Sequence, residues 1–152
     1  RSSINRLKNE YGLRCILIDC PPTLGLLSMN SLCAADHLLV TLQSEYLALE
    51  GLGQIIGVIE QLKSAGANPN LSLGGIVMTM YDNRTRLSYE VWQEVTNHYP
   101  EKVFRTAIPR TIRLSEAPSF GKTIFEYDSR SLGAQAYSAF TKEVINRFLI
   151  TT

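Results

Sequence analysis

Short apolar runs alternate with longer segments of helical spacing along this sequence, and this alternation constrains the fold more than any other feature. Four runs are nearly continuous in apolar residues, which predicts strands over residues 15–18, 38–42, 73–80 and 103–108. Elsewhere apolar residues recur at helical intervals, which predicts helices over residues 24–35, 49–65, 87–99 and 137–148. Apolar strands separated by helices are typical of parallel sheets. We therefore expect an α/β fold, a mostly parallel sheet flanked by helices, in a single domain over residues 1–152.

The charges of the chain nearly cancel, because fifteen Lys and Arg stand against fourteen Asp and Glu. This balance excludes a protein that is held to nucleic acid by its overall charge, so an anionic partner has to meet a local patch. Within residues 102–122 only Glu116 opposes five cations, a surplus of four, and these are Lys102, Arg105, Arg110, Arg113 and Lys122. No aromatic residues alternate with these cations, so we expect sequence-independent contact with duplex DNA phosphates.

The ends of the chain bear on its surroundings. No run approaches the roughly 18 apolar residues that a membrane-spanning helix needs. Residues 148–152 are uncharged, whereas a membrane-binding amphipathic helix is basic on one face. We therefore expect no membrane partner and a cytoplasmic location. Because the sequence begins at Arg1 and opens in what looks like the end of a helix, we also expect a piece of a longer chain.

Polar residues follow three of the predicted strands at the point where each strand ends. Asp19 follows the first of them, residues 79–82 end the third, and Pro109-Arg110-Thr111 follow the fourth. Right-handed crossovers between parallel strands would gather these residues at one edge of the sheet, where α/β folds bind ligands. Nucleotide-binding sheets place a carboxylate near Mg²⁺ in the position of Asp19, although an Asp there can also simply cap the next helix.

One segment imitates a phosphate-binding loop without meeting its requirements. Phe120-Gly121-Lys122-Thr123 has the end of the pattern GxxxxGK[ST], but Glu116 occupies the position of the first glycine. No apolar strand leads into the segment either. We therefore interpret the similarity as accidental.

Four segments together carry a resemblance to a known family. They are Ile16-Leu17-Ile18-Asp19-Cys20-Pro21-Pro22, then Gln43-Ser44-Glu45-Tyr46-Leu47-Ala48-Leu49-Glu50-Gly51, then Thr79-Met80-Tyr81-Asp82 with Arg84-Thr85, and finally residues 108–122, which include Arg113-Leu114-Ser115-Glu116-Ala117-Pro118-Ser119-Phe120-Gly121-Lys122. In this order and at these separations they resemble the ParA/Soj family of chromosome- and plasmid-partitioning ATPases. The match covers nearly the whole chain, and its last segment is the most specific.

The resemblance implies a fold and an activity. The fold is the C-terminal portion of a deviant P-loop NTPase fold, and the ATP-bound homodimer of this family binds double-stranded DNA non-specifically. Hydrolysis of ATP with Mg²⁺ is stimulated by a ParB/Spo0J-type partner, at the nucleoid. The family's Walker-A loop with its signature lysine occurs nowhere in this chain. The resemblance thus implies the C-terminal part of such an ATPase, a piece that is inactive and binds nucleotide poorly by itself.

The resemblance also implies a nucleotide site. Asp19 corresponds to the catalytic Walker-B carboxylate, which holds Mg²⁺ through a bound water, and Cys20-Pro21-Pro22 corresponds to a switch that responds to the γ-phosphate. Pro109 and Thr111 would lie against the nucleotide base through backbone groups, with Met80 nearby. The residues alone favour an ordinary strand-ending turn for Pro109 and a core side chain for Met80.

Two arginines match family positions linked to DNA binding, namely Arg84 and Arg113. From the residues alone, each is equally well a solvated surface charge, as most arginines are. Other functions also remain open. The chain could come from another deviant-Walker ATPase, such as a MinD-like division regulator or a metal-cluster carrier, or could act as a nucleotide-free interaction fragment.

Overall fold

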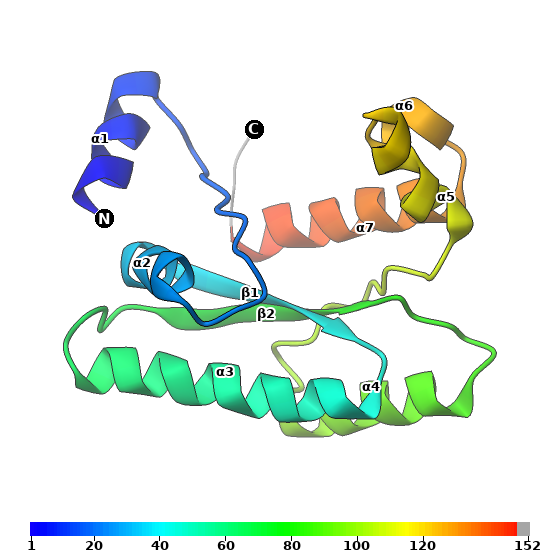
Figure 1. Cartoon of the computed structure of the whole chain (residues 1–152), viewed down its shortest axis with the longest axis horizontal. Coiled ribbons are helices and arrows are strands. Elements are labelled where there is room, and N and C mark those ends of the chain that lie inside the picture. Colours follow the sequence, from blue (N-terminus) through cyan, green and yellow to red (C-terminus); the bar gives the residue numbers. More distant parts are fainter. Residues whose placement is uncertain (149–152) are drawn as a thin grey trace. The chain divides into compact units, whose positions relative to one another are not determined.

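The computed structural model describes residues 1–148, and Figure 1 shows their helices and strands. The elements follow one another in the order α1 (Ser2–Tyr11), α2 (Leu26–Ala34), β1 (His37–Gln43), α3 (Tyr46–Ser64), β2 (Ser72–Thr79), α4 (Arg86–His98), α5 (Ile112–Glu116), the short 3-10 helix η1 (Ala117–Phe120), α6 (Ile124–Asp128) and α7 (Leu132–Arg147). The C-terminal residues on which the argument against a membrane partner partly rests, 149–152, lie outside this description. In residues 1–148, no helix is both long and apolar enough to cross a membrane.

The chain divides into two compact units. Unit 1 comprises residues 1–38 and 53–74, and unit 2 comprises residues 39–52 and the described residues from 75 onward. The strands β1 and β2 and the helix α3 each run from one unit into the other. The expectation of a single domain over residues 1–152 stays a prediction.

The sheet contains the two parallel strands β1 and β2 as hydrogen-bonded neighbours. These strands confirm the predictions for residues 38–42 and 73–80. In β1 the buried Val40 and Leu42 alternate with exposed Thr41 and Gln43, whereas β2 is buried continuously over residues 74–78. A strand with apolar residues on both faces is covered on both faces, as its sequence indicates.

The prediction of a strand at residues 15–18 is wrong. These residues have no regular secondary structure, and the side chain of Leu17 is 82% exposed. An apolar run becomes a buried strand only where another strand satisfies its backbone N–H and C=O groups. Within the described part of the chain, no strand pairs with this run.

The prediction of a continuous strand at residues 103–108 is also wrong, although this segment does run parallel to β2. It forms isolated bridges, Ile76 with Val103 and Tyr81 with Pro109. Between the bridges the backbone N–H groups of Arg105 and Thr106 donate to the carboxylate of Glu143 on α7, at 2.9 and 2.8 Å. Since a side chain takes these two donors, the ladder is interrupted there.

The predicted helices are confirmed as α2, α3, α4 and α7. The left-handed Gly66, with φ of 71°, follows the end of α3, and the Thr85 side chain caps the start of α4. The helices α5, η1 and α6 within residues 110–130 were not predicted. Each is four or five residues long, too short to show an apolar period, and α5 and α6 depend on the capping threonines Thr111 and Thr123.

Unit 1 encloses an apolar core between α2, the later part of α3 and the start of β2. Its buried members are Leu32, Ile59, Leu62 and Leu71. Beside this core the side chain of Asn68, only 3% exposed, donates from Nδ2 to the carbonyl oxygens of Leu32 and Ala35, both at 2.8 Å. These carbonyls lie at the C-terminal end of α2 and have no partner within the helix ladder. The side chain of Asn68, which lies in a loop, thus caps the C-terminal end of α2.

Replacing Asn68 by Ala is expected to lower the free energy of unfolding by about 2–3 kcal/mol, because it removes one buried and one partly buried hydrogen bond and leaves both carbonyls unsatisfied. Urea denaturation followed by circular dichroism measures the change. The matched control is Asn70→Ala, two residues away and exposed, which should change stability by less than about 0.5 kcal/mol. Equal effects of the two substitutions would contradict this role of Asn68.

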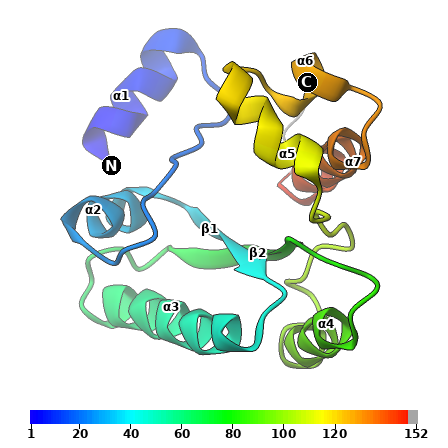
Figure 2. The same ribbon diagram turned by 45° about the vertical axis from the view of Figure 1, so that its right-hand side comes forward.

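Unit 2 is built around β2 and the segment beside it. Val77, Phe104 and Ile108 form a buried cluster against Ala136, Phe140 and Val144 of α7. Because successive residues of a strand point to opposite faces, the buried Ile76 and Met78 face away from α7. Figures 1 and 2 show α4 on that other side of β2. In this unit α7 and α4 therefore cover the two faces of β2.

Glu143 gives the segment beside β2 a pH dependence. Burial alone raises the pKa of this carboxyl, but hydrogen bonds from the Thr106 hydroxyl and from the backbone N–H groups of Arg105 and Thr106 outweigh burial, so the pKa lies below its usual 4.5. A lowered pKa means that the stabilisation is fully present above the unfolded value and is lost as the pH falls through the folded value.

We expect Glu143→Gln to lose about 1 kcal/mol of stability at neutral pH and to show a flatter decline in stability below about pH 4.5. Denaturation midpoints measured from neutral pH down into the acid range test this. Glu60→Gln, which neutralises an exposed carboxylate, serves as the control. If both variants follow the wild-type pH profile, the carboxylate of Glu143 does not hold the segment.

Candidate functional site

The carboxyl end of β2 meets the end of the neighbouring segment in unit 2. Tyr81 N–H donates to the Ile108 carbonyl at 3.0 Å, and Arg110 N–H donates to the Tyr81 carbonyl at 3.1 Å. Asp19, residues 79–82 and Pro109-Arg110-Thr111 were predicted to share one edge of the sheet, and this pairing confirms the prediction for the last two segments. We refer to residues 79–84 and 109–113 together as the strand-end site.

Met80 has an unusual backbone at this site. Its φ is 50°, which is the left-handed region, and among the described residues no other non-glycine has a positive φ. Its side chain is 53% exposed rather than buried, so it is not a core side chain. A left-handed non-glycine residue costs roughly 1–2 kcal/mol. Such strain is concentrated at ligand-binding sites, although it also serves here to turn the chain from β2 toward Tyr81.

Arg84 forms a two-pronged ion pair with Asp82. Its Nε donates to Asp82 Oδ1 at 2.9 Å and its Nη2 to Oδ2 at 2.7 Å, while the Arg84 backbone N–H donates to Oδ1 at 3.0 Å. The arginine side chain is nevertheless 85% exposed. The hydrogen bonds from the Arg84 side chain, then from its backbone, hold the pKa of Asp82 at about 2. The carboxylate is therefore ionised at neutral pH.

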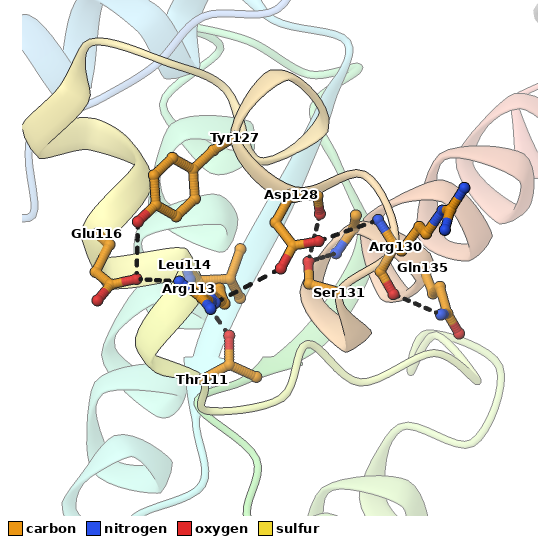
Figure 3. A network of polar contacts seen from close by, with 10 residues as sticks. Thr111, Arg113, Leu114, Glu116, Tyr127, Asp128, Arg130, Ser131 and Gln135 are labelled. Carbon is orange, nitrogen blue, oxygen red and sulfur yellow. Dashed lines mark hydrogen bonds and ion pairs between the residues drawn. The ribbon is translucent and has the colours of Figure 1, made fainter.

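Arg113 lies in a second network, formed by α5 and α6 (Figure 3). Its Nη1 is 3.2 Å from Glu116 Oε2 and its Nε is 3.6 Å from Asp128 Oδ2. The Tyr127 hydroxyl donates to the same Glu116 oxygen at 3.0 Å, and the guanidinium carbon lies 6.0 Å from the centre of the Tyr127 ring. These two carboxylates and the aromatic ring hold the guanidinium of Arg113 in one position on the surface.

Thr111 acts through its side chain as well as its position. Its hydroxyl oxygen accepts the backbone N–H of Leu114 at 3.3 Å and so begins α5. Leu114 in turn packs against Ala117 and Ala134, and it leaves no room for a Cβ at Gly133 of α7. The turn that carries Thr111 and Arg113 is thereby tied to α7.

The surplus of four positive charges holds for the sequence of residues 102–122, but the fold brings a further carboxylate to this stretch. Asp128 lies outside that stretch of sequence, yet it approaches Arg113 to 3.6 Å. The counting missed it because a charge fifteen residues away comes close only when α5 and α6 fold back on each other. Arg113 and Glu116, by contrast, are three residues apart on a helix and could have been paired from the spacing.

Asp19 belongs to unit 1, in the segment without regular structure before α2, and it is exposed. An exposed single carboxylate fits Mg²⁺, which keeps several waters and takes one or two protein carboxylates beside phosphate oxygens. In residues 1–148, no group of three or more His, Cys, Asp or Glu is arranged to hold a metal ion. The assignment of Asp19 to magnesium stays a prediction.

Comparison with solved structures gives the class of protein. The chain superposes on the cobyrinic acid a,c-diamide synthase of Mycobacterium smegmatis, solved with a bound ATP analogue and magnesium, with a TM-score of 0.74 and 33% identity over 96% of this chain and 51% of that one. Its fold is therefore that of the P-loop NTPases, as the family resemblance implied. An AAA domain family model also matches residues 1–73.

Relatives give the family. The chain is 46% identical over 147 residues to the chromosome partitioning protein ParA of Myxococcus xanthus, covering 97% of this chain and 51% of the relative. It is 48% identical to the chromosome-partitioning ATPase Soj of Treponema pallidum, covering 93% of this chain and 54% of the relative. The chain belongs to the ParA/Soj family. It spans about half the length of these relatives.

Proposed function

We propose that this chain is the C-terminal part of an ATPase that acts in chromosome or plasmid partitioning. The intact protein, meaning this chain together with a phosphate-binding loop, would dimerise with ATP, bind DNA non-specifically and hydrolyse ATP when a ParB/Spo0J-type partner stimulates it. Its place of action would be the nucleoid in the cytoplasm. The family of its relatives and the residues at the strand-end site support this proposal.

The nucleotide side of the proposal gives separate roles to Asp19 and to three residues of unit 2. Asp19 would hold Mg²⁺ through a bound water, and the ion would neutralise charge on the transferred phosphoryl group. In unit 2, Pro109 and Thr111 would contact the base through backbone groups, with Met80 beside them. The exposed side chain of Met80, held by a strained backbone, supports this role.

The DNA side of the proposal depends on one observation. The backbone pairing of Tyr81 with Pro109 and Arg110 makes the two turns that carry Arg84 and Arg113 neighbours. Both arginine side chains are more than half exposed, at 85% and 56%. Two exposed guanidinium groups on adjacent turns can contact successive phosphates of one duplex, and a dimer would present two such pairs.

Replacing Arg84 or Arg113 by Ala in the intact ATP-bound protein is expected to weaken binding to every duplex sequence alike, by about tenfold. The slope of log affinity against log salt should fall by about one unit for each lost phosphate contact, while ATP binding stays largely unchanged. Fluorescence anisotropy with duplexes of unrelated sequence, at salt concentrations from about 50 to 200 mM, measures both quantities.

The matched control for this experiment is Arg6→Ala. Arg6 lies on α1, its side chain is 85% exposed like that of Arg84, and it also faces a carboxylate, that of Glu10 at 3.9 Å. The control removes the same charge without touching the strand-end site. If Arg84→Ala and Arg113→Ala bind DNA no more weakly than Arg6→Ala, the two arginines are ordinary surface charges and the DNA side of the proposal fails.

A further inference from the structure

Each of the two arginines assigned to DNA binding is already occupied by carboxylates of its own chain. Asp82 takes the Nε and Nη2 groups of Arg84, and Glu116 and Asp128 face Arg113. We propose that these carboxylates are built-in competitors of the DNA phosphates and that they set the strength of DNA binding. This inference rests on the proposed DNA-binding function and adds residues to it.

The carboxylates reverse the net charge that the two arginines present to DNA. Arg84 with Asp82 has no net charge, and Arg113 with Glu116 and Asp128 has a formal charge of −1. The two arginines therefore present one negative charge in total to an approaching duplex, whereas the arginines alone would present two positive ones. Because non-specific affinity grows with the number of phosphates that cations neutralise, these carboxylates weaken binding.

The ion pairs can give way to phosphate. Carboxylate and phosphate oxygens both match the planar fork of a guanidinium, so one can replace the other without moving the arginine backbone. Exposed ion pairs contribute little to stability, and the side chain of Arg84 is 85% exposed. Of the five N–H groups of this guanidinium, two point to Asp82, which leaves three for a phosphate while the pair is still formed.

Asp82 is placed for competition by the backbone rather than by Arg84 alone. Its Oδ1 accepts the Arg84 backbone N–H at 3.0 Å, and the Asp82 carbonyl accepts from the Thr85 hydroxyl at 3.0 Å. The carboxylate therefore stays beside the guanidinium when a phosphate binds. An amide at this position can accept the same backbone N–H, so it preserves the turn while it removes the charge.

The test is Asp82→Asn in the intact ATP-bound protein, with a short fluorescein-labelled duplex as the probe. We expect affinity to rise by about three- to tenfold, and the salt slope to steepen by about one unit, because one more cation becomes available to a phosphate. Glu116→Gln, which keeps an acceptor for the Tyr127 hydroxyl, should raise affinity in the same direction through Arg113. The two variants act on separate turns, so each checks the other.

Glu10→Gln is the matched control, because it neutralises a carboxylate that pairs with Arg6 on α1, a helix that contributes no residue to the strand-end site. A gain as large as that of Asp82→Asn would show a general effect of net charge and overturn the inference. So would unchanged or weaker binding by both Asp82→Asn and Glu116→Gln, since the carboxylates would then only orient the arginines. If the inference fails in this way but Arg84→Ala and Arg113→Ala still weaken binding, the proposed DNA binding is unaffected. Only unchanged binding by those two alanine variants contradicts the proposed DNA binding.

Discussion

Titration of MgATP into the 152-residue chain is expected to show no binding in the micromolar range. Phosphates of nucleotides are held by a ring of backbone N–H groups in a glycine-rich loop and by the lysine that follows it. The pattern GxxxxGK[ST] occurs nowhere in this chain. The exposed carboxylate of Asp19 is an acceptor and cannot supply hydrogen-bond donors to phosphate oxygens.

In the segment most similar to such a loop, residues 120–123, the donors of Thr123 already have an acceptor within the chain. Thr123 caps α6, and its backbone N–H and hydroxyl both donate to the carboxylate of Glu126, at 2.9 and 2.8 Å. An anion of the chain itself thus occupies these donors. Isothermal titration calorimetry is the measurement, with the intact protein as the positive control. A clear micromolar isotherm from the chain alone would show that nucleotide is held by other groups.

A methyl group added at Gly75 is expected to lower stability by about 3 kcal/mol, the largest loss that we expect from any single small substitution. Gly75 lies in β2, and a Cβ there would come within 2.6 Å of Arg147 Nη1 and within 2.9 Å of Phe104 Cζ. Phe104 is fully buried and packs edge-on against Phe140, with ring centres 4.9 Å apart. The guanidinium carbon of Arg147 lies over the Phe104 ring, 3.8 Å from its centre, so the ring is held between two neighbours.

Gly57→Ala is the matched control for Gly75→Ala. Gly57 is exposed in the interior of α3, and an added Cβ there would meet nothing within 4 Å. Since Ala favours a helix over Gly, this substitution should raise stability by about 1 kcal/mol. Denaturant midpoints of the two variants should therefore move in opposite directions. A Gly75→Ala protein as stable as the wild type would mean that the packing around Phe104 is looser than the structure indicates.

Periodicity predicted most of the regular elements because the residues that carry the signal are the ones that become buried. Leu32 belongs to the helical pattern of α2 and Ile59 and Leu62 to that of α3, and all three lie in the core of unit 1. The run from Ile76 to Met78 is apolar throughout and is buried throughout in β2. Periodicity was misleading where an apolar run has no partner, as at Leu17, because pairing is a property of two segments.

The strand-end site could be predicted only in part. The topological rule for parallel strands placed Tyr81 and Pro109 at one edge, and the structure pairs them. No rule of spacing connects Asp128 with Arg113 or Glu143 with Thr106, since these pairs are fifteen and thirty-seven residues apart. Long-range polar contacts of this kind depend on the completed fold. They decide here how much charge the site presents and where the backbone beside β2 runs.

The hydrogen bonds from residues 105 and 106 to Glu143 affect the order in which parts of the chain fold during its synthesis. The acceptor for the Thr106 N–H is thirty-seven residues further along the chain. Until α7 has left the ribosome, the N–H groups of Arg105 and Thr106 lack their partner, and only the backbone contacts with β2 and Tyr81 hold the segment that leads to Pro109. The strand-end site is therefore among the last parts of unit 2 to be completed, and a nascent chain interrupted before α7 would carry its arginines on an unfinished surface.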